Sequence, residues 1–277
     1  MRNKNKLKII IIAILVVSVL ICGILVVDKT GVFEEETTTE PVTLATAKIT
    51  FIEGSTLTEI FKLLEQNGVC SYDALMNTAQ NYRFTDYKIY GDIPVDEDRC
   101  FKLEGYLFPD TYDFFLNEAA ESVIARFLSN SDVKITDEMR NRATELGYTV
   151  DEIMIIASII QAEGAFTDDA ATIAGIIYNR LEDGIKLQMD STYFYVEDDI
   201  ASYVGEENAD SYKEIYDTYT CYSLPQGPVC NPGMFAINAA LYPEETDYYY
   251  FCHDNDGNTY YAKTYNEHLR NCEKAGL

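Results

Sequence analysis

The segment 150–164 reads VDEIMIIASIIQAEG and decides the fold of this 277-residue chain. Residues 153–160 are apolar on nearly every side, and a helix of this kind is buried in the centre of a domain. Thr149 and Glu152 form a capping box at its start, and Gly164 stands where it ends. The sequence therefore predicts a buried central helix over 150–163.

A carboxyl group ends this helix. Glu163 follows Ile156 and Ile160 in steps of three and four residues, so it lies on the same face as they do. Desolvation and the negative end of the helix dipole both raise the pKa of a carboxyl in such a place. A carboxyl that stays protonated near neutral pH is what a general acid requires. The alternative is a carboxylate that bends out to solvent at the helix end.

The segments around this helix predict an α+β fold, with helices and hairpins segregated along the chain. Strands alternate at 248–252 and 259–262 around a turn-rich loop. The stretch 101–115 is aromatic and broken by Gly105 and Pro109, which indicates extended, buried chain. Further helices are expected at 119–129, 137–146 and 169–182, with a last one capped by Thr264 and Glu267.

The first 47 residues predict a membrane anchor and a linker. Four basic residues precede 9–27, a run of 19 residues without charge that is long enough to span a bilayer core. The basic residues place 1–8 in the cytoplasm and the rest of the chain outside, as a single-pass protein of the cell membrane. The alternative, a cleaved signal peptide, would have a shorter apolar run and small residues at its end. The acidic, threonine-rich stretch 28–47 is typical of a linker.

After the linker, 48–85 is expected to form a small strand–helix–helix module, and 86–277 the main domain. The alternating stretch 48–52 predicts the strand, and Leu57, Ile60, Phe61 and Leu64 share one helical face. A second short helix is expected from Tyr72 to Gln80. This module is too short for much stability of its own.

Composition excludes several classes of protein. Hydrophobic residues make up 47% of the chain and aromatic residues 13%, which rules out wholesale disorder. A net charge of −25 repels phosphate backbones, so no nucleic acid is expected as a partner. Only two histidines occur and no C-x-x-C, so no metal site and no cofactor is predicted. Six cysteines follow the apolar run, and the choice between disulfides and buried free thiols stays open.

Two more segments concentrate polar groups. The helix 169–182 ends in Tyr178-Asn179-Arg180, and the loop 187–192 (LQMDST) brings amide and carboxylate groups that suit sugar hydroxyls and N-acetyl groups. Asp190 could instead cap the N-terminus of a short helix, and Arg180 could simply pair with an acidic residue.

Taken in order, these segments resemble the endolytic murein transglycosylases, the MltG-type or YceG-like family. The motifs are EGYLFPDTY at 104–112, ASIIQAE at 157–163, AGIIYNRL at 174–181, LQMDST at 187–192 and NPG at 231–233. The resemblance covers about two thirds of the chain, from residue 102 onward, and the segment 48–80 resembles an abbreviated LysM-like module. It implies a transglycosylase catalytic domain over 86–277.

The resemblance implies cleavage of peptidoglycan glycan strands between N-acetylmuramic acid and N-acetylglucosamine, with a 1,6-anhydro end as product. Because the attacking group is the substrate's own 6-hydroxyl, one carboxyl can serve as both acid and base, whereas hydrolases need two. Glu163 matches the catalytic glutamate. Glu104, Gln188, Asp190 and Asn231 match motif positions and are expected to line the cleft and position substrate. Penicillin-binding synthases in the membrane are candidate partners.

The sequence departs from the family pattern in three places. Gln161 stands where a second acid is frequent, Ser191 replaces a frequent proline, and the segment before Glu104 is short. Two alternatives stay open: a hydrolytic muramidase that pairs Glu163 with a second carboxylate such as Asp190, and a membrane-tethered scaffold of the wall-synthesis machinery without catalysis.

Overall fold

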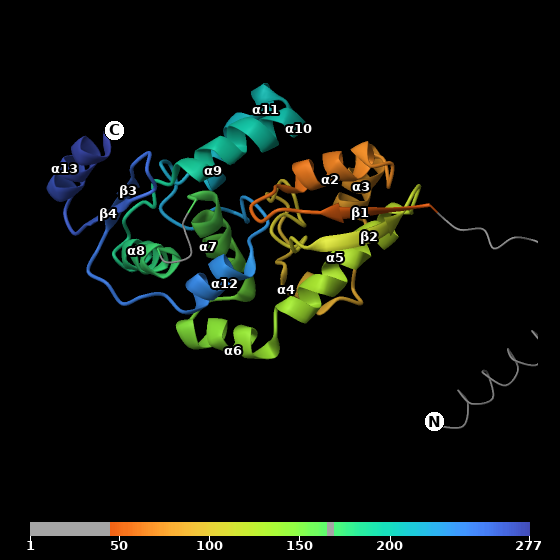
Figure 1. Cartoon of the computed structure of the whole chain (residues 1–277), viewed down its shortest axis with the longest axis horizontal. Helices are drawn as coiled ribbons and strands as arrows, with labels where there is room; N and C mark the ends of the chain where they lie inside the picture. Colours follow the sequence, from red (N-terminus) through yellow and green to blue (C-terminus); the bar gives the residue numbers. More distant parts are fainter. Residues whose placement is uncertain (1–44, 165–168) are drawn as a thin grey trace, which may run out of the picture. The chain divides into compact units, whose positions relative to one another are not determined.

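The structure, a computed structural model, describes residues 45–164 and 169–277 (Figure 1). Its small antiparallel sheets and many helices confirm the α+β class. The bounds of the first elements are β1 (Thr46–Thr50), α2 (Leu57–Gln66), α3 (Tyr72–Asn81), α4 (Lys88–Asp92), β2 (Thr111–Phe115), α5 (Ala120–Lys134), α6 (Asp137–Leu146), α7 (Val150–Ala162) and α8 (Ala170–Glu182). The rest are α9 (Asp190–Tyr195), the π-helical turn η1 (Val196–Ile200), α10 (Ala201–Val204), α11 (Glu206–Tyr216), α12 (Met234–Leu241), β3 (Tyr250–His253), β4 (Thr259–Ala262) and α13 (Tyr265–Ala275).

Strands β1 and β2 pair antiparallel although 61 residues separate partners such as Thr50 and Thr111. Alternate side chains of β2 face inward, where Tyr112 and Phe114 meet Phe51 and Phe127. The ring centroids of Tyr112 and Phe127 lie 4.5 Å apart. This aromatic cluster brings Phe51, which directly follows β1, and helix α5 into one core. The segments 48–85 and 86–277 therefore pack against each other.

Helix α7 forms the centre, as its sequence predicts. Nine of its residues are buried, and α12, α8 and α6 pack around it. The capping box of Thr149 and Glu152 is present at its start. On one side, the hydroxyl of Ser158 accepts a hydrogen bond from the amide of Val229 at 3.0 Å, which fixes the later loop against the helix.

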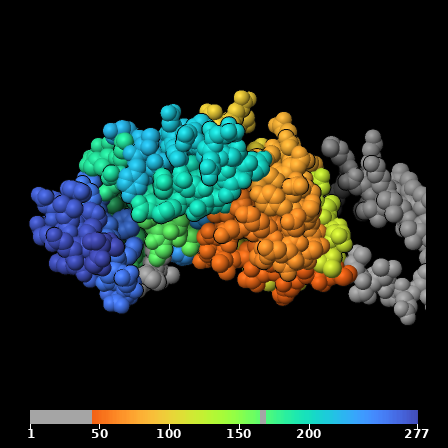
Figure 2. All heavy atoms as spheres, turned by 90° about the horizontal axis from the view of Figure 1, so that it is seen from above, coloured from red at the N-terminus to blue at the C-terminus, as the bar shows by residue number. Residues whose placement is uncertain are grey.

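The hairpin of β3 and β4 and the last helix α13 lie at one end of this unit, and β1, β2, α2 and α3 lie at the other (Figure 1). Helices α9 to α11 lie between these ends on the face seen in Figure 2. The expected hairpin and the capping box of Thr264 and Glu267 are both present. Helix α5 runs five residues beyond its expected end at 129, and Ser131 continues the buried face of Ile124 and Leu128.

No helix within 45–164 and 169–277 is long and apolar enough to cross a bilayer. The expected membrane segment 9–27 and most of the linker 28–47 lie outside the described residues. All six cysteines in the described part of the chain are free thiols, so the disulfide alternative is not realised there.

Candidate functional site

Glu163 lies at the C-cap of α7, directly after a helix in which nine residues are buried. Burial raises the pKa of its carboxyl, and the negative charge of Asp190 acts in the same direction, whereas contacts from Ser191 oppose them. The amide of Ser191 donates a hydrogen bond to Oε1 of Glu163 at 3.3 Å. The side chain is half-buried rather than turned fully into solvent. A carboxyl in this state can hold a proton and still meet a ligand.

A groove of about 500 Å³ opens beside this carboxyl. Its floor includes Glu163 and Arg180, and the loop after α8 contributes Gln188 and Asp190. Aromatic and polar side chains of later segments complete the wall: Tyr219, Tyr250, Phe251, Cys252, His253, Tyr265, His268 and Cys272. Three of the five residues expected from the sequence, Glu163, Gln188 and Asp190, therefore share one groove.

The loop 187–192 is held in a defined shape. Gln188 adopts a left-handed backbone with φ +53°, which non-glycine residues seldom do and which is typical of functional sites. On either side, Leu187 and Met189 are buried, and the amide of Met189 donates to Oγ1 of Thr218 at 2.8 Å. The loop therefore turns the exposed side chain of Gln188 toward the groove while its neighbours anchor it.

Asp190 is the first residue of α9, and Met189 occupies the N-cap position, so the interpretation of Asp190 as a helix cap is wrong. Its Oδ1 instead accepts a hydrogen bond from the hydroxyl of Tyr219 at 2.6 Å. This bond joins the two sides of the groove. Tyr219 stands in the sequence beside Thr220, but no local pattern shows that its hydroxyl reaches Asp190.

The motif at 174–181 positions the segment that leads into β3, a strand that lines the groove. Gly175 lets the chain at Glu244 pass against α8, because a Cβ there would lie 2.2 Å from the carbonyl oxygen of Glu244. Asn179 donates to the carbonyls of Thr246 and Tyr248 at 2.8 and 3.0 Å. These contacts fix the segment that leads into β3.

Arg180 joins two walls of the same groove. Its Nε donates to the carbonyl of Tyr249 at 2.5 Å, and its Nη1 donates to the carbonyls of Lys186 and Leu187 at 2.9 and 2.7 Å. Among the described residues, it forms no ion pair with an acid, so the simple pairing considered from the sequence is not found there.

Glu104 and Asn231 lie together in the interior, and neither lines the groove. Asn231 donates to Oε1 of Glu104 at 2.9 Å, the amide of Leu57 donates to both carboxyl oxygens at 3.0 Å, and Tyr195 donates at 3.1 Å. Burial raises the pKa of Glu104 to about 8, with the charge of Asp199 adding to the effect. Both motif residues thus join α2, α9 and the segment 231–233.

Gln161, which stands where the family often has a second acidic residue, contacts the segment before α12. Its Oε1 accepts a hydrogen bond from the amide of Gly233 at 3.0 Å. An ionised acid could accept the same hydrogen bond, so a side chain at position 161 can hold the segment 231–233 with or without a charge. Glu163 is therefore the one carboxyl that this helix end turns to the groove.

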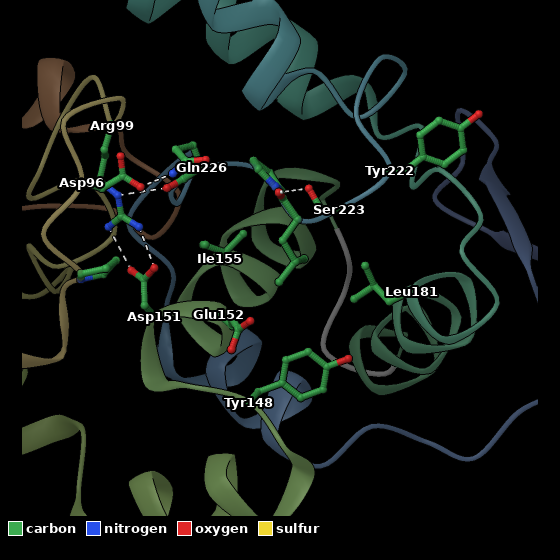
Figure 3. Close-up of a pocket in the computed structure, with 13 residues that line it drawn as sticks. Asp96, Arg99, Tyr148, Asp151, Glu152, Ile155, Leu181, Tyr222, Ser223 and Gln226 are labelled. Carbon is green, nitrogen blue, oxygen red and sulfur yellow. Dashed lines mark hydrogen bonds and ion pairs between the residues drawn. The ribbon is translucent and has the colours of Figure 1, made fainter.

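A second pocket, of about 440 Å³, lies beside the N-terminal half of α7 (Figure 3). In this pocket, Arg99 and Asp151 form an ion pair, with Nη2 of Arg99 2.6 Å from Oδ2 of Asp151. Nε of Arg99 donates a hydrogen bond to the carbonyl of Gln226 at 3.0 Å. The pair is buried, and Tyr106 also donates to Asp151. A carboxylate committed to an arginine in this way is a poor proton donor, so the groove at Glu163 is the better candidate for chemistry.

Comparison with known proteins agrees with the motifs. The model of the YceG-like family matches residues 33–274. An endolytic murein transglycosylase of Streptococcus pneumoniae is 30% identical over 254 residues, which cover 84% of this chain and 45% of the relative. One of Bacillus subtilis is 32% identical over 178 residues, which cover 62% of this chain and 48% of the relative. The chain therefore spans about half the length of the curated relatives it matches.

A solved structure supports the fold. The crystal structure of a yceG-like protein from Listeria monocytogenes matches with a TM-score of 0.71 at 30% identity, covering 81% of this chain and 75% of that chain. The arrangement of helices around α7 is therefore one that a related sequence adopts.

Proposed function

This chain belongs to the YceG-like family, and from that membership and the groove at Glu163 we propose that it is a membrane-anchored endolytic lytic transglycosylase of peptidoglycan. The curated relatives carry the name endolytic murein transglycosylase. The single observation that carries the proposal is a carboxyl with a raised pKa at the open end of a buried helix. The uncharged run 9–27 supports the anchor, with the groove outside the membrane.

Glu163 acts first as a general acid. Its proton passes to the glycosidic oxygen between N-acetylmuramic acid and N-acetylglucosamine, and the bond from that oxygen to C1 breaks. The 6-hydroxyl of the same muramic acid then bonds to C1 and gives its proton to the Glu163 carboxylate. The product is a 1,6-anhydro end, no water is consumed, and the carboxyl returns to its protonated form.

Burial matters to both steps. A carboxyl with an ordinary pKa near 4.3 would be ionised at neutral pH and could not donate. The raised pKa keeps a larger share of Glu163 protonated, and after transfer its carboxylate is a stronger base. Gln188 and Asp190 offer amide and carboxylate groups to the sugar, and Arg180 positions their loop through its carbonyl contacts.

Glu104 and Asn231 have a different role in this proposal. Because both are buried and bond to one another, they support the loops from inside rather than touch the glycan.

A hydrolytic muramidase is the second candidate, because Asp190 lies in the same groove and its charge acts on Glu163. In that reaction, Asp190 would activate water or attack the sugar, and the product would be a reducing end. The hydroxyl of Tyr219 already occupies Oδ1 of Asp190 at 2.6 Å, which leaves this carboxylate less free to activate water or to attack the sugar and so favours the transglycosylase.

The test is digestion of purified sacculi with the full-length protein in detergent, followed by mass analysis of the ends released. We expect 1,6-anhydro-muramic ends from the wild type and none from Glu163→Gln. Glu182→Gln, the same change at an exposed position of α8, is the matched control and should cleave normally. Reducing ends would favour the muramidase, and no cleavage by the folded wild type would favour a scaffold.

A further inference from the structure

One wall of the groove carries three side chains that commonly bind metal ions. Cys252 comes from β3, and His268 and Cys272 lie one turn apart on α13. Their ligand atoms all lie within 4.8 Å of one another. Cys252 is buried, and the other two are half-buried at the groove's edge.

We propose that Cys252, His268 and Cys272 bind a thiophilic divalent metal ion of the zinc type, which fastens α13 to β3 at the wall of the groove. This departs from the expectation, drawn from the scarcity of histidine and the absence of C-x-x-C, that the chain binds no metal. The proposal concerns the metal alone and stands whether or not the groove cleaves glycans.

The spacing of the cluster suits a tetrahedral ion. With Zn–S near 2.3 Å and Zn–N near 2.0–2.1 Å, tetrahedral angles put S and N about 3.6 Å apart and two S atoms about 3.8 Å apart. Sγ of Cys272 lies 3.6 Å from Nε2 of His268. Because Sγ of Cys252 lies within 4.8 Å of both other ligand atoms, it would have to move by about 1 Å or less to reach tetrahedral spacing.

The donor set selects the class of metal. Two thiolates and one imidazole favour zinc and similar soft or borderline ions over magnesium and calcium, which prefer oxygen. His268 stacks on Tyr250 with centroids 5.3 Å apart, which fixes the plane of the imidazole. Three protein ligands leave a fourth position for water or another ligand.

The last helix needs such a fastening. Ala275 is its only fully buried residue, so the hydrophobic effect contributes little to holding α13 in place. Its contacts with the hairpin include the rings of Tyr265 and His268 on Tyr250 and a hydrogen bond from Asn271 to the carbonyl of Tyr261 at 3.0 Å. Helix α13 lies beside β3 and β4 (Figure 1). A metal shared by strand and helix would join them directly, and its binding energy would become folding energy.

The test uses the full-length protein, reduced and stripped with a chelator, and titrated with Zn²⁺ and with Co²⁺ as a spectroscopic probe. We expect one ion per chain, a thiolate-to-cobalt charge-transfer band, and stronger protection of α13 amides from hydrogen exchange when Zn²⁺ is bound. Cys252→Ser, Cys272→Ser and His268→Gln should each weaken binding by more than about 100-fold, since even second-layer partners of metal ligands contribute 10- to 100-fold.

Cys70→Ser, which removes a half-buried thiol outside the cluster, is the matched control and should bind as the wild type does. Circular dichroism of each variant shows whether it is folded, and the wild-type titration alone decides stoichiometry if a variant is not. Failure of the reduced wild type to bind Zn²⁺ would overturn the proposal, as would binding that the three cluster variants leave unchanged. A Cys252–Cys272 disulfide that forms in place of metal binding would overturn it too.

Discussion

The amide of Ser191 donates a hydrogen bond to Oε1 of Glu163 at 3.3 Å. This contact joins the end of the buried helix α7 to the start of α9, so the carboxyl lies directly against the loop 187–192. It also explains why Asp190, the neighbour of Ser191, acts on the pKa of Glu163. The proposed catalytic carboxyl and the loop 187–192 are therefore coupled electrostatically.

Replacing Asp190 with Asn should lower the pKa of Glu163. The negative charge of Asp190 disfavours ionisation of Glu163, so its removal makes the carboxylate easier to form. Activity that needs the protonated acid is lost as pH rises through this pKa, so the alkaline limb of kcat/KM should move to lower pH. Tyr219→Phe keeps the charge of Asp190, so the alkaline limb of this variant should lie at a pH closer to that of the wild type. A limb that moves to higher pH in Asp190→Asn would contradict the assignment.

Gln188→Gly should raise or preserve stability while lowering activity. The backbone at Gln188 has φ +53°, where an L-residue costs about 1 kcal/mol that glycine does not. Gln188→Ala keeps that cost and removes the same amide, so it is the matched control. Thermal unfolding and sacculus cleavage separate the two effects. The strain argument fails if the glycine variant unfolds at a lower temperature than the alanine variant.

Gly175→Ala should destabilise the protein by about 1–3 kcal/mol. Alanine favours a helix by up to about 1 kcal/mol over glycine, but its Cβ would lie 2.2 Å from the carbonyl oxygen of Glu244, which is backbone and cannot turn away. Gly91→Ala in α4, where a Cβ would meet nothing within 4 Å, should be neutral or stabilising. Denaturant unfolding of both variants gives the comparison. Equal stability of the two would show that the chain at 244–246 is not packed as described.

Glu104→Gln should flatten the dependence of stability on pH. The folded protein holds the Glu104 proton up to a pKa of about 8, whereas the unfolded chain releases it near 4.3. The folded state therefore binds more protons between these values, and its stability is full below pH 4.3 and falls as pH rises toward 8. The slope for one such group is at most about 1.4 kcal/mol per pH unit.

The amide of Gln has no proton to lose in this range, so Glu104→Gln should lose less stability between pH 5 and 8 than the wild type. Glu182→Gln, at an exposed site, should retain the wild-type slope. Urea unfolding at several pH values measures it. A slope in Glu104→Gln as steep as in the wild type would mean that Glu104 is already ionised in the folded protein.

Local signals in the sequence predict the local structure well. The apolar face and capping box predict α7, and the turn residues predict the hairpin of β3 and β4. Glu163, Gln188 and Asp190 stand beside a helix end or in a polar loop and match family motifs, and the structure places all three in one groove, while their roles stay a prediction. The pairing of β1 with β2 could not be predicted, since it joins residues about 60 positions apart.

Long-range side-chain contacts were missed for the same reason. Glu104 and Asn231 meet across 127 residues, and nothing local indicates that this pair turns inward. The approach of Cys252 to α13 depends on how the hairpin folds back. The spacing of His268 and Cys272, four residues apart on a capped helix, was the one signal in the sequence that could have pointed to the cluster.

The most direct test of the central claim is titration of the Glu163 carboxyl itself in the full-length protein. The infrared difference between wild type and Glu163→Gln, followed across pH, isolates that one group. We expect a pKa clearly above the ordinary 4.3, equal to the pKa of the alkaline limb of kcat/KM, and a loss of about 10²- to 10⁴-fold in cleavage by Glu163→Gln. An ordinary pKa for Glu163, or cleavage by Glu163→Gln at the wild-type rate, would contradict it.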